Sequence, residues 1–205
     1  MAFTEDFTGT NGDDVSTLAG WTKLPGAFKC IVASNGFGGQ GDVGTGVGTY
    51  TCTDQGDADN YVQLDLLSVA SRISGACTRV VDKDNWWGFW ARGTGSGGMR
   101  IVKCISGTVS TLSGMTGQPA VKTYKLEATT NGSNTDLELF EDGISFLGPT
   151  SQANADVSGT ETSQGIFNSG QSTGTSTAAY DNFEAGILGA GAVGIEIFRR
   201  RIEGY

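Results

Sequence analysis

The sequence predicts an all-β fold, and three observations support that prediction. Glycine makes up 33 of the 205 residues, far above its average share of roughly 7%. The glycines cluster with Ser, Thr, Asn and Asp between short stretches in which apolar and polar residues alternate. Before residue 185 no stretch has a helical period. Many short period-two strands joined by tight turns are typical of an antiparallel sandwich, and about 200 residues can form one such domain.

The strands follow one another along the chain at short intervals. In the clearest of them Val62, Leu64 and Leu66 alternate with Gln63 and Asp65, which is the period of a half-buried strand. By the same criteria we expect strands in segments 3–8, 20–24, 28–33, 61–66, 77–81, 86–92, 99–105, 108–112, 124–128, 137–140, 144–147, 165–167 and 178–184.

Turn residues mark the connections between these strands. Ser106-Gly107 and Asp142-Gly143 each separate two strand-like segments, and such dipeptides favour two-residue hairpin turns. Residues 36–48 hold seven glycines, and we expect them to form a loop.

The order of the motifs is similar to a known family. Segment 82–89 reads Asp-Lys-Asp-Asn-Trp-Trp-Gly-Phe; later come Glu141-Asp142-Gly143 and a closing strand with Tyr180-Asp181-Asn182-Phe183. This succession resembles the concanavalin A-like, laminin-G-like jelly roll over roughly residues 2–186. The resemblance implies two stacked antiparallel sheets with the first and last strands adjacent.

Composition and charge exclude several classes of function. The formal net charge is −9 and the sequence pI is about 4.4, so the surface repels nucleic acid phosphates. The first six residues contain no basic and apolar signal segment. The longest weakly apolar run, 185–198, is glycine-rich, contains Glu196 and is too short to span a bilayer. We therefore expect a product made in the cytoplasm without a membrane span.

Catalytic motifs are lacking, and the prediction is that the protein is not an enzyme. Histidine is absent, which removes Ser-His-Asp and Cys-His mechanisms. Some jelly rolls are glucanases that use paired carboxylates. Here Asp136 and Glu138 would share a strand face, but Glu141 is out of phase, so a solvated face is the favoured interpretation.

Four cysteines occur without a close pair, at Cys30, Cys52, Cys77 and Cys104. Zinc is therefore not expected. The favoured interpretation is buried free thiols that pack as small hydrophobes. The alternative is disulfides formed after release from the cell, within or between subunits.

Trp86, Trp90 and Arg92 would share one face of strand 86–92, with Gly88 between the tryptophans. Two indoles separated by a glycine could form a flat platform for a protein partner or a sugar. We rank burial first, protein contact second and glycan binding third.

The family resemblance also suggests a metal. Relatives of this fold often hold a structural calcium between the first and last strands. Asp6 (or Glu5) and Asp181 occupy suitable positions, and their oxygens suit calcium. No other cofactor is expected.

Residues 187–205 differ in character from the rest, and we divide the chain into a jelly-roll domain, 1–186, and an extended C-terminal assembly arm, 187–205. The arm begins with small apolar residues and continues as an amphiphilic segment with a basic triplet. Such a segment suits docking on another subunit. Its candidate contact residues are Ile195, Ile197, Phe198, Arg199, Arg200, Arg201 and Tyr205.

These observations lead to a functional prediction by elimination. A lectin-like domain without a secretion signal but with a docking arm suggests a bacteriophage virion component, a decoration or accessory protein of the capsid, neck or tail. Its partners would be other virion proteins in a many-copy assembly. The alternative is a carbohydrate-binding module or host-recognition adhesin for a cell-surface glycan.

Overall fold

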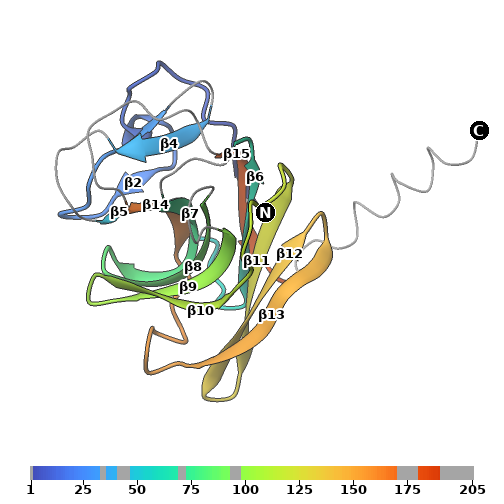
Figure 1. Cartoon of the computed structure of the whole chain (residues 1–205). Helices are drawn as coiled ribbons and strands as arrows, with labels where there is room; N and C mark the ends of the chain where they lie inside the picture. The colour runs from blue at the N-terminus through green and yellow to red at the C-terminus, as the bar shows by residue number, and fades with distance from the viewer. Residues whose placement is uncertain are drawn as a thin grey trace, which may run out of the picture.

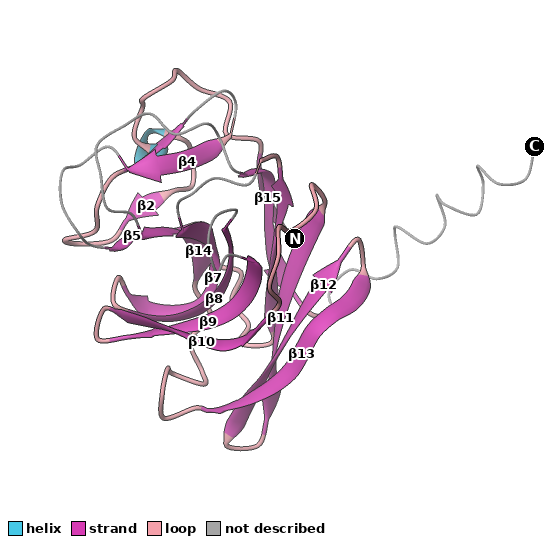
Figure 2. Ribbon diagram, viewed as in Figure 1, coloured by secondary structure: helices cyan, strands magenta, loops and turns pink. Residues whose placement is uncertain are grey.

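The computed structural model describes residues 2–32, 36–40, 47–68, 73–92, 98–169 and 180–189. Within these ranges the chain forms fifteen β-strands and one short 3-10 helix, η1 (Val15–Thr17). No helix in the described part is long and apolar enough to cross a membrane. The predicted all-β class is confirmed (Figure 2).

The strands form two antiparallel sheets. The eight-stranded sheet contains β1 (Phe3–Glu5), β3 (Cys30–Val32), β4 (Phe37–Gln40), β6 (Asn60–Leu66), β11 (Thr123–Asn131), β12 (Asn134–Glu141), β13 (Ile144–Ala153) and β15 (Tyr180–Ile187). The seven-stranded sheet contains β2 (Thr22–Lys23), β5 (Val47–Thr51), β7 (Ile73–Asp82), β8 (Asn85–Arg92), β9 (Gly98–Ile105), β10 (Thr108–Gly114) and β14 (Gln164–Ser169).

The strand order is that of a jelly-roll sandwich. It is β13-β12-β11-β6-β15-β4-β3 in the eight-stranded sheet, with β1 also paired to β15, and β10-β9-β8-β7-β14-β5-β2 in the other (Figure 1). Phe3 pairs with Ala185 and Glu5 with Phe183. The first and last described strands are therefore adjacent, as the sequence predicted.

Two glycine-containing dipeptides form hairpin turns, and so fix the strand register, at the positions that the sequence predicted. Ser106 and Gly107 have φ values of 49° and 76°, and Asp142 and Gly143 have 49° and 79°. Two successive positive φ angles define the hairpin turn whose twist matches that of the flanking strands. Both predicted hairpins are confirmed.

The expected loop at 36–48 is wrong in part. Phe37–Gln40 forms β4, and Val47–Thr51 forms β5; residues 41–46 lie outside the described part. Glycine serves close packing here, because a Cβ on Gly48 would lie 2.5 Å from the carbonyl oxygen of Phe28. Tertiary contact therefore outweighs the weak strand propensity of glycine.

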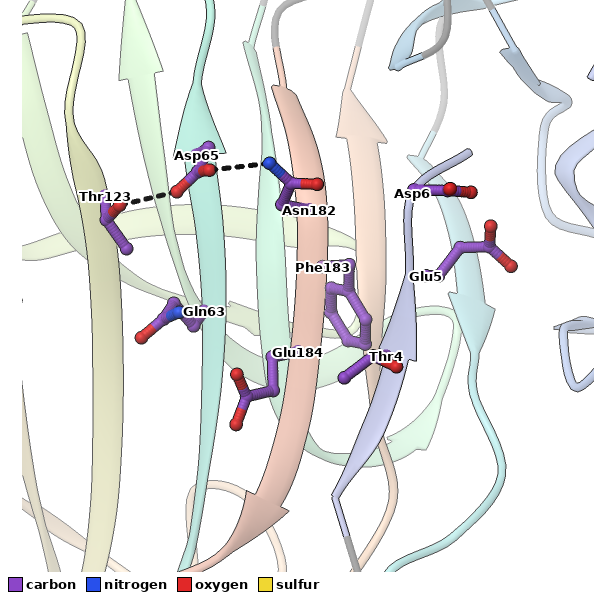
Figure 3. A pocket seen from close by; sticks show the side chains of 9 residues that line it. All are labelled: Thr4, Glu5, Asp6, Gln63, Asp65, Thr123, Asn182, Phe183 and Glu184. Carbon is purple, nitrogen blue, oxygen red and sulfur yellow. Dashed lines mark hydrogen bonds between the residues drawn. The ribbon is translucent and has the colours of Figure 1, made fainter. Parts of the chain in front are cut away.

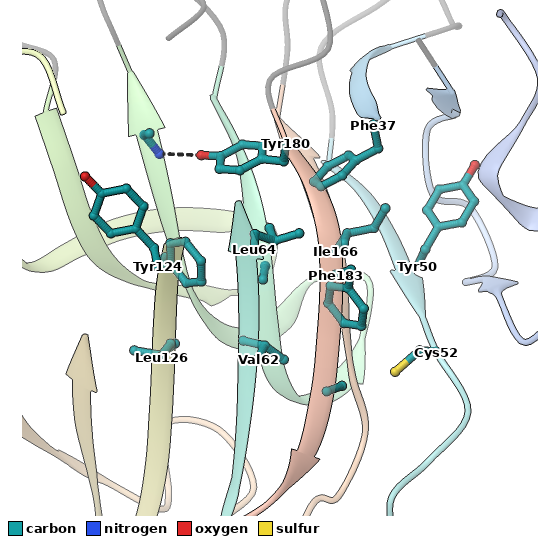
Figure 4. Packing of buried hydrophobic residues seen from close by; sticks show 14 of the residues in the cluster. Phe37, Tyr50, Cys52, Val62, Leu64, Tyr124, Leu126, Ile166, Tyr180 and Phe183 are labelled. Carbon is teal, nitrogen blue, oxygen red and sulfur yellow. Dashed lines mark hydrogen bonds between the residues drawn. The ribbon is translucent and has the colours of Figure 1, made fainter. Parts of the chain in front are cut away.

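The main core lies between the two sheets (Figure 4). Val62, Leu64, Tyr124 and Leu126 project into it from the eight-stranded sheet. The facing residues of the seven-stranded sheet include Trp87, Phe89, Ala91, Ile101 and Ile166. A second apolar cluster lies on the opposite face of the seven-stranded sheet, formed by Cys77, Val80, Trp86, Trp90, Val102, Cys104 and Phe167.

A buried arginine secures the segment that leads into β6. Arg79 has no exposed surface, and its Nε donates to the carbonyl oxygen of Ala58 at 2.9 Å. Its Nη1 donates to the carbonyl oxygen of Gly159 at 2.8 Å, and Nη2 to Thr130 Oγ1 at 3.0 Å. Its guanidinium lies 5.7 Å from the ring centroid of Trp87. These bonds fix loops from different parts of the chain at one end of β6.

The division at residue 186 stays a prediction. Strand β15 runs to Ile187. The predicted contact residues of the arm, Ile195, Ile197, Phe198, Arg199, Arg200, Arg201 and Tyr205, lie outside the described residues.

Candidate functional site

A polar groove lies on the outer face of the eight-stranded sheet, the face turned away from the core. Its volume is about 550 Å³. Four strands or strand ends contribute to it: β1, β15, β6 and β11 (Figure 3). Its lining residues are Thr4, Glu5, Asp6, Gln63, Asp65, Thr123, Asn182, Phe183 and Glu184.

Strand alternation places the polar side chains in this groove. In β6 the burial pattern alternates strictly, so Gln63 and Asp65 face outward while Val62 and Leu64 are buried. In β15 the pairing with β6 shifts between Asp181 and Glu184. Asn182 takes a φ of 49° at this shift. The bulge lets β15 present Asn182 and Glu184 to the groove, a typical use of an irregularity in a sheet.

Hydrogen bonds hold part of the lining in place. Thr123 Oγ1 donates to Asp65 Oδ1 at 2.5 Å, and Asn182 Nδ2 donates to Asp65 Oδ2 at 2.8 Å (Figure 3). The hydroxyl of Tyr61 donates to Glu184 Oε1. The amide of Gln63 has no partner within the described part of the chain, so its donor and acceptor face the groove unused. The groove is thus preorganised on one side and open to new hydrogen bonds on the other.

Charge in the groove is of one sign. Four of its lining residues are carboxylic acids, and none is Lys or Arg. Burial raises the pKa of Glu5, and the neighbouring Asp6 raises it further. Burial also raises the pKa of Asp181, with Asp6 and Asp65 adding to the effect. In contrast, hydrogen bonds from Thr8 lower the pKa of Asp6. The groove therefore offers acceptors to hydroxyl or cationic donors and repels anions.

The predicted tryptophan platform is not on the surface. Trp86 has no exposed surface and Trp90 is 8% exposed. The ring of Phe167 packs on Trp86 with 4.2 Å between centroids. A Cβ on Gly88 would lie 3.2 Å from that phenyl ring, so the glycine makes room for the ring between the indoles. Trp86 and Trp90 are buried, as the interpretation ranked first had it; a glycan or partner platform at these residues stays a prediction, and the side chain of Arg92 lies outside the described part.

The two predicted calcium ligands fall at the groove. Asp6 lines it, and Asp181 is close enough for the charges of Asp6 and Asp65 to raise its pKa. Among the described residues, however, no group of three or more His, Cys, Asp or Glu side chains could hold a metal ion. The calcium site stays a prediction without a ligand set.

The four cysteines are buried and none is in a disulfide, as the favoured interpretation had it. Burial raises the pKa of Cys52 and of Cys104 to about 12. It raises the pKa of Cys77 as well. Because the thiolate is the reactive form, these groups are inert at neutral pH. The structure contains none of the alternative disulfides within the chain.

The acids considered for glucanase chemistry form a solvated face. Asp136 Oδ2 accepts from Asn131 Nδ2 at 2.8 Å, and Glu138 accepts from the Ser145 hydroxyl. Glu141, out of phase as predicted, accepts from Lys122 at 2.7 Å. These bonds tie the acids to surface neighbours.

The sequence did not predict this groove, although it placed several of its residues. It assigned Gln63 and Asp65 to the polar face of their strand and placed segment 3–8 beside 180–184. It missed Thr123, Asn182 and Glu184. Combining the predicted pairing of the terminal strands with the alternation in β15 would have pointed to Glu184. Asn182 belongs to a residue type that tolerates positive φ, but nothing in the neighbouring sequence marks it as the site of a bulge.

Comparison with known proteins shows likeness in structure only. No family model and no curated protein sequence matches the chain. A xylan β-1,4-xylosidase from Bacillus halodurans C-125 aligns over 89% of this chain with a TM-score of 0.58 and 14% identity. This chain spans 38% of that protein. The exoplasmic/lumenal domain of VIP36, in a Ca²⁺/Man2-bound form, aligns over 96% of this chain and 91% of its own, with a TM-score of 0.50 and 11% identity.

A third structure is a phage protein, the CBM2 module of the evolved Dit of Lactobacillus casei BL23 phage J-1. It covers 89% of this chain and 93% of its own, with a TM-score of 0.49 and 10% identity. At such low identities, likeness extends to architecture alone. The chain has a two-sheet antiparallel jelly-roll sandwich fold.

Proposed function

We propose that this protein is a non-catalytic carbohydrate-recognition domain and that the groove between β1, β15, β6 and β11 is its glycan-binding site. The observation that carries the proposal is the groove's lining of carboxylate, amide and hydroxyl groups on a rigid sheet. Two solved structures of similar fold support it: one is a xylan β-1,4-xylosidase and the other is the lumenal domain of VIP36 in a Ca²⁺/Man2-bound form.

The chemistry of the lining suits sugar hydroxyls. Each hydroxyl both donates and accepts hydrogen bonds, and charged acceptors form the stronger bonds. Glu184 and Glu5 supply carboxylate acceptors, while the free amide of Gln63 supplies one donor pair and one acceptor. Because Asp65 is already held by Thr123 and Asn182, the lining loses little conformational freedom on binding. Preorganisation of this kind raises affinity.

The negative charge of the groove favours uncharged sugars over acidic sugars as ligands. Uronates and sialates would bring an anion toward four carboxylates with no lysine or arginine in the lining. In this proposal the acids bind the sugar and do not catalyse a reaction on it. Asp65 and Glu184 already accept hydrogen bonds from protein donors, and the chain has no histidine to act as a general acid or base.

A second candidate function is the structural virion protein, a capsid, neck or tail accessory anchored by its C-terminal arm. The observation that favours it is the change at residue 187 from turn-rich β sequence to an apolar segment with Arg199, Arg200 and Arg201, in a chain of net charge −9. The two functions are compatible, because a virion accessory can carry a glycan-binding sandwich.

The test is a glycan array followed by titration calorimetry on the hits. Gln63→Ala removes an outward amide that bonds no described neighbour, so the fold should survive while glycan affinity falls about threefold to tenfold, the worth of one or two hydrogen bonds. Gln118→Ala, at an exposed amide away from the groove, is the matched control and should bind normally. If no neutral glycan binds, or Gln63→Ala binds as well as wild type, the proposal fails.

A further inference from the structure

Two aromatic side chains lie on the open face of the eight-stranded sheet beside the groove. Tyr61 in β6 and Phe140 in β12 occupy outward positions, and both are half-buried. Outward positions of such a strand are ordinarily polar. Both residues therefore place apolar surface on the outer face of the sheet, where it does not contribute to the core.

A lysine between them shows where their faces point. Lys125 in β11 pairs in register with Gln63 on one side and with Phe140 on the other. Its Nζ lies 5.1 Å from the ring centroid of Phe140 and 5.6 Å from that of Tyr61. One ammonium group thus contacts both rings, so the two rings border a common space. Glu127 Oε1 pairs with the same Nζ at 2.5 Å.

Tyr61 connects this space to the groove. Its ring lies over the backbone of β15, because a Cβ on Gly186 would come within 2.7 Å of the ring and hydroxyl atoms. Its hydroxyl donates to Glu184, which lines the groove. Because Gly186 has no side chain, the ring can lie flat on the backbone of β15. The hydrogen bond to Glu184 fixes the orientation of the ring beside the groove.

We propose that Tyr61, Lys125 and Phe140 form a second sugar subsite continuous with the groove, so that the ligand is a neutral oligosaccharide chain rather than a single sugar. This inference rests on the proposed function of the groove. A sugar ring has an apolar C–H face whose hydrogens carry slight positive charge, and aromatic faces are electron-rich. The ammonium of Lys125 occupies that position in the free protein.

Lys125 can yield this position to a sugar. Its charge sits on a flexible four-carbon stem, and its ion pair with Glu127 is on the surface, where such pairs contribute little. When a sugar ring covers the aromatic faces, Lys125 and Glu127 remain at its edge to bond its hydroxyls. The subsite thus combines a stacking surface with one donor and one acceptor.

The experiment measures affinity against chain length by titration calorimetry with cello-, xylo- and manno-oligosaccharides of two to six units. For the wild-type protein, affinity for the series that binds should rise about tenfold between the shortest and the longest chain, the worth of one stacked ring. Phe140→Ala should remove this rise and leave the affinity for the disaccharide unchanged. Tyr61→Phe keeps the ring and should retain the rise.

Ile144→Ala is the control, since Ile144 is 73% exposed and lies outside both the groove and the aromatic pair. A purely structural role for Phe140 would lower thermal stability without changing the length dependence. The subsite is refuted if wild-type affinity does not rise with length while the disaccharide binds, or if the rise persists in Phe140→Ala. If no probe binds the wild-type protein, the proposed function itself fails, and the subsite with it.

Discussion

Two faces of this sandwich carry aromatic side chains outside the main core, and they differ in almost every physical respect. On the outer face of the seven-stranded sheet, Trp86 and Trp90 are buried in one cluster with Phe167, whose ring packs on Trp86. On the outer face of the eight-stranded sheet, Tyr61 and Phe140 are half-buried beside a polar groove. Strand β8 is apolar on both of its faces, whereas β6 and β12 alternate.

The role of an aromatic side chain in a strand depends on whether the strand is apolar on both faces or on one. A run that is apolar at every position indicates a strand covered on both faces. An isolated aromatic at the polar phase of an alternating strand has no such cover. In this chain the conspicuous tryptophans stabilise the fold, while the inconspicuous Tyr61 and Phe140 are available for binding.

The largest expected effect separates the two faces by stability. Trp86→Ala should lower the free energy of unfolding by about 3–5 kcal/mol, because it leaves a cavity under Phe167. Tyr61→Ala should cost about 1 kcal/mol, a typical value for a substitution outside the core. Urea denaturation of both variants checks this. Equal losses would mean that Tyr61 belongs to a packed layer and would remove the contrast.

Gly88 and Gly186 lie beside the aromatic side chains of the two faces. A Cβ on Gly88 would lie 2.5 Å from the carbonyl oxygen of Ala76, and backbone cannot move cheaply, so Gly88→Ala should cost about 1–3 kcal/mol of stability. The three atoms nearest to a Cβ on Gly186 all belong to the movable side chain of Tyr61. Gly186→Ala should therefore leave the thermal midpoint nearly unchanged but displace Tyr61 and weaken oligosaccharide binding. Calorimetric melting and titration on both variants test the pair, and a destabilised Gly186→Ala with intact binding would contradict it.

Whether the sequence could predict a feature depends on whether neighbouring or distant residues produce it. Alternation in segment 61–66 and the Asp142-Gly143 turn depend on neighbouring residues, so the strands and hairpins were accessible. The cover over Trp86 comes from Phe167, some eighty residues later, and no local pattern reveals it. Strand β4 forms in a glycine-rich stretch because β3 and β15 pair with it. The groove depends on the bulge at Asn182; Asn tolerates a positive φ, but that tolerance alone does not locate a bulge within a strand.

Charge gives a third test, specific to the open face. Because the groove presents four acids to solvent, a neutral oligosaccharide should bind about tenfold more tightly than its uronate counterpart at low salt, a difference of about 1.4 kcal/mol. The difference should shrink in about 1 M salt, where the Debye length is about 3 Å. Paired titrations of manno- and mannuronate oligosaccharides measure it. Discrimination that is unchanged by salt would indicate shape rather than charge.

The smallest expected effect concerns the pH dependence of two aspartates on this face. Burial raises the pKa of Asp181, with help from Asp6 and Asp65. The folded protein therefore holds this proton more tightly than the unfolded chain, and stability falls as pH rises from about 4 through the raised pKa. At pH 7 the charged Asp181 is unfavourable. Because Asp181 is only half-buried and solvent screens much of the repulsion, Asp181→Asn should raise the melting temperature by only about 1–2 °C, for a gain of about 0.5 kcal/mol.

That gain should disappear near pH 3, where Asp181 is protonated in both states. Asp136 provides the matched control of opposite sign, because hydrogen bonds from Ser151 and Asn131 lower its pKa. A lowered pKa contributes stability above about pH 4 that is lost as pH falls through the folded value. Asp136→Asn should accordingly lower the melting temperature slightly at pH 7 and have no effect in acid. The melting temperatures of the two variants, measured from pH 3 to pH 7, should diverge as the pH rises. Parallel dependences on pH would show that the fold shifts the pKa of neither carboxylate.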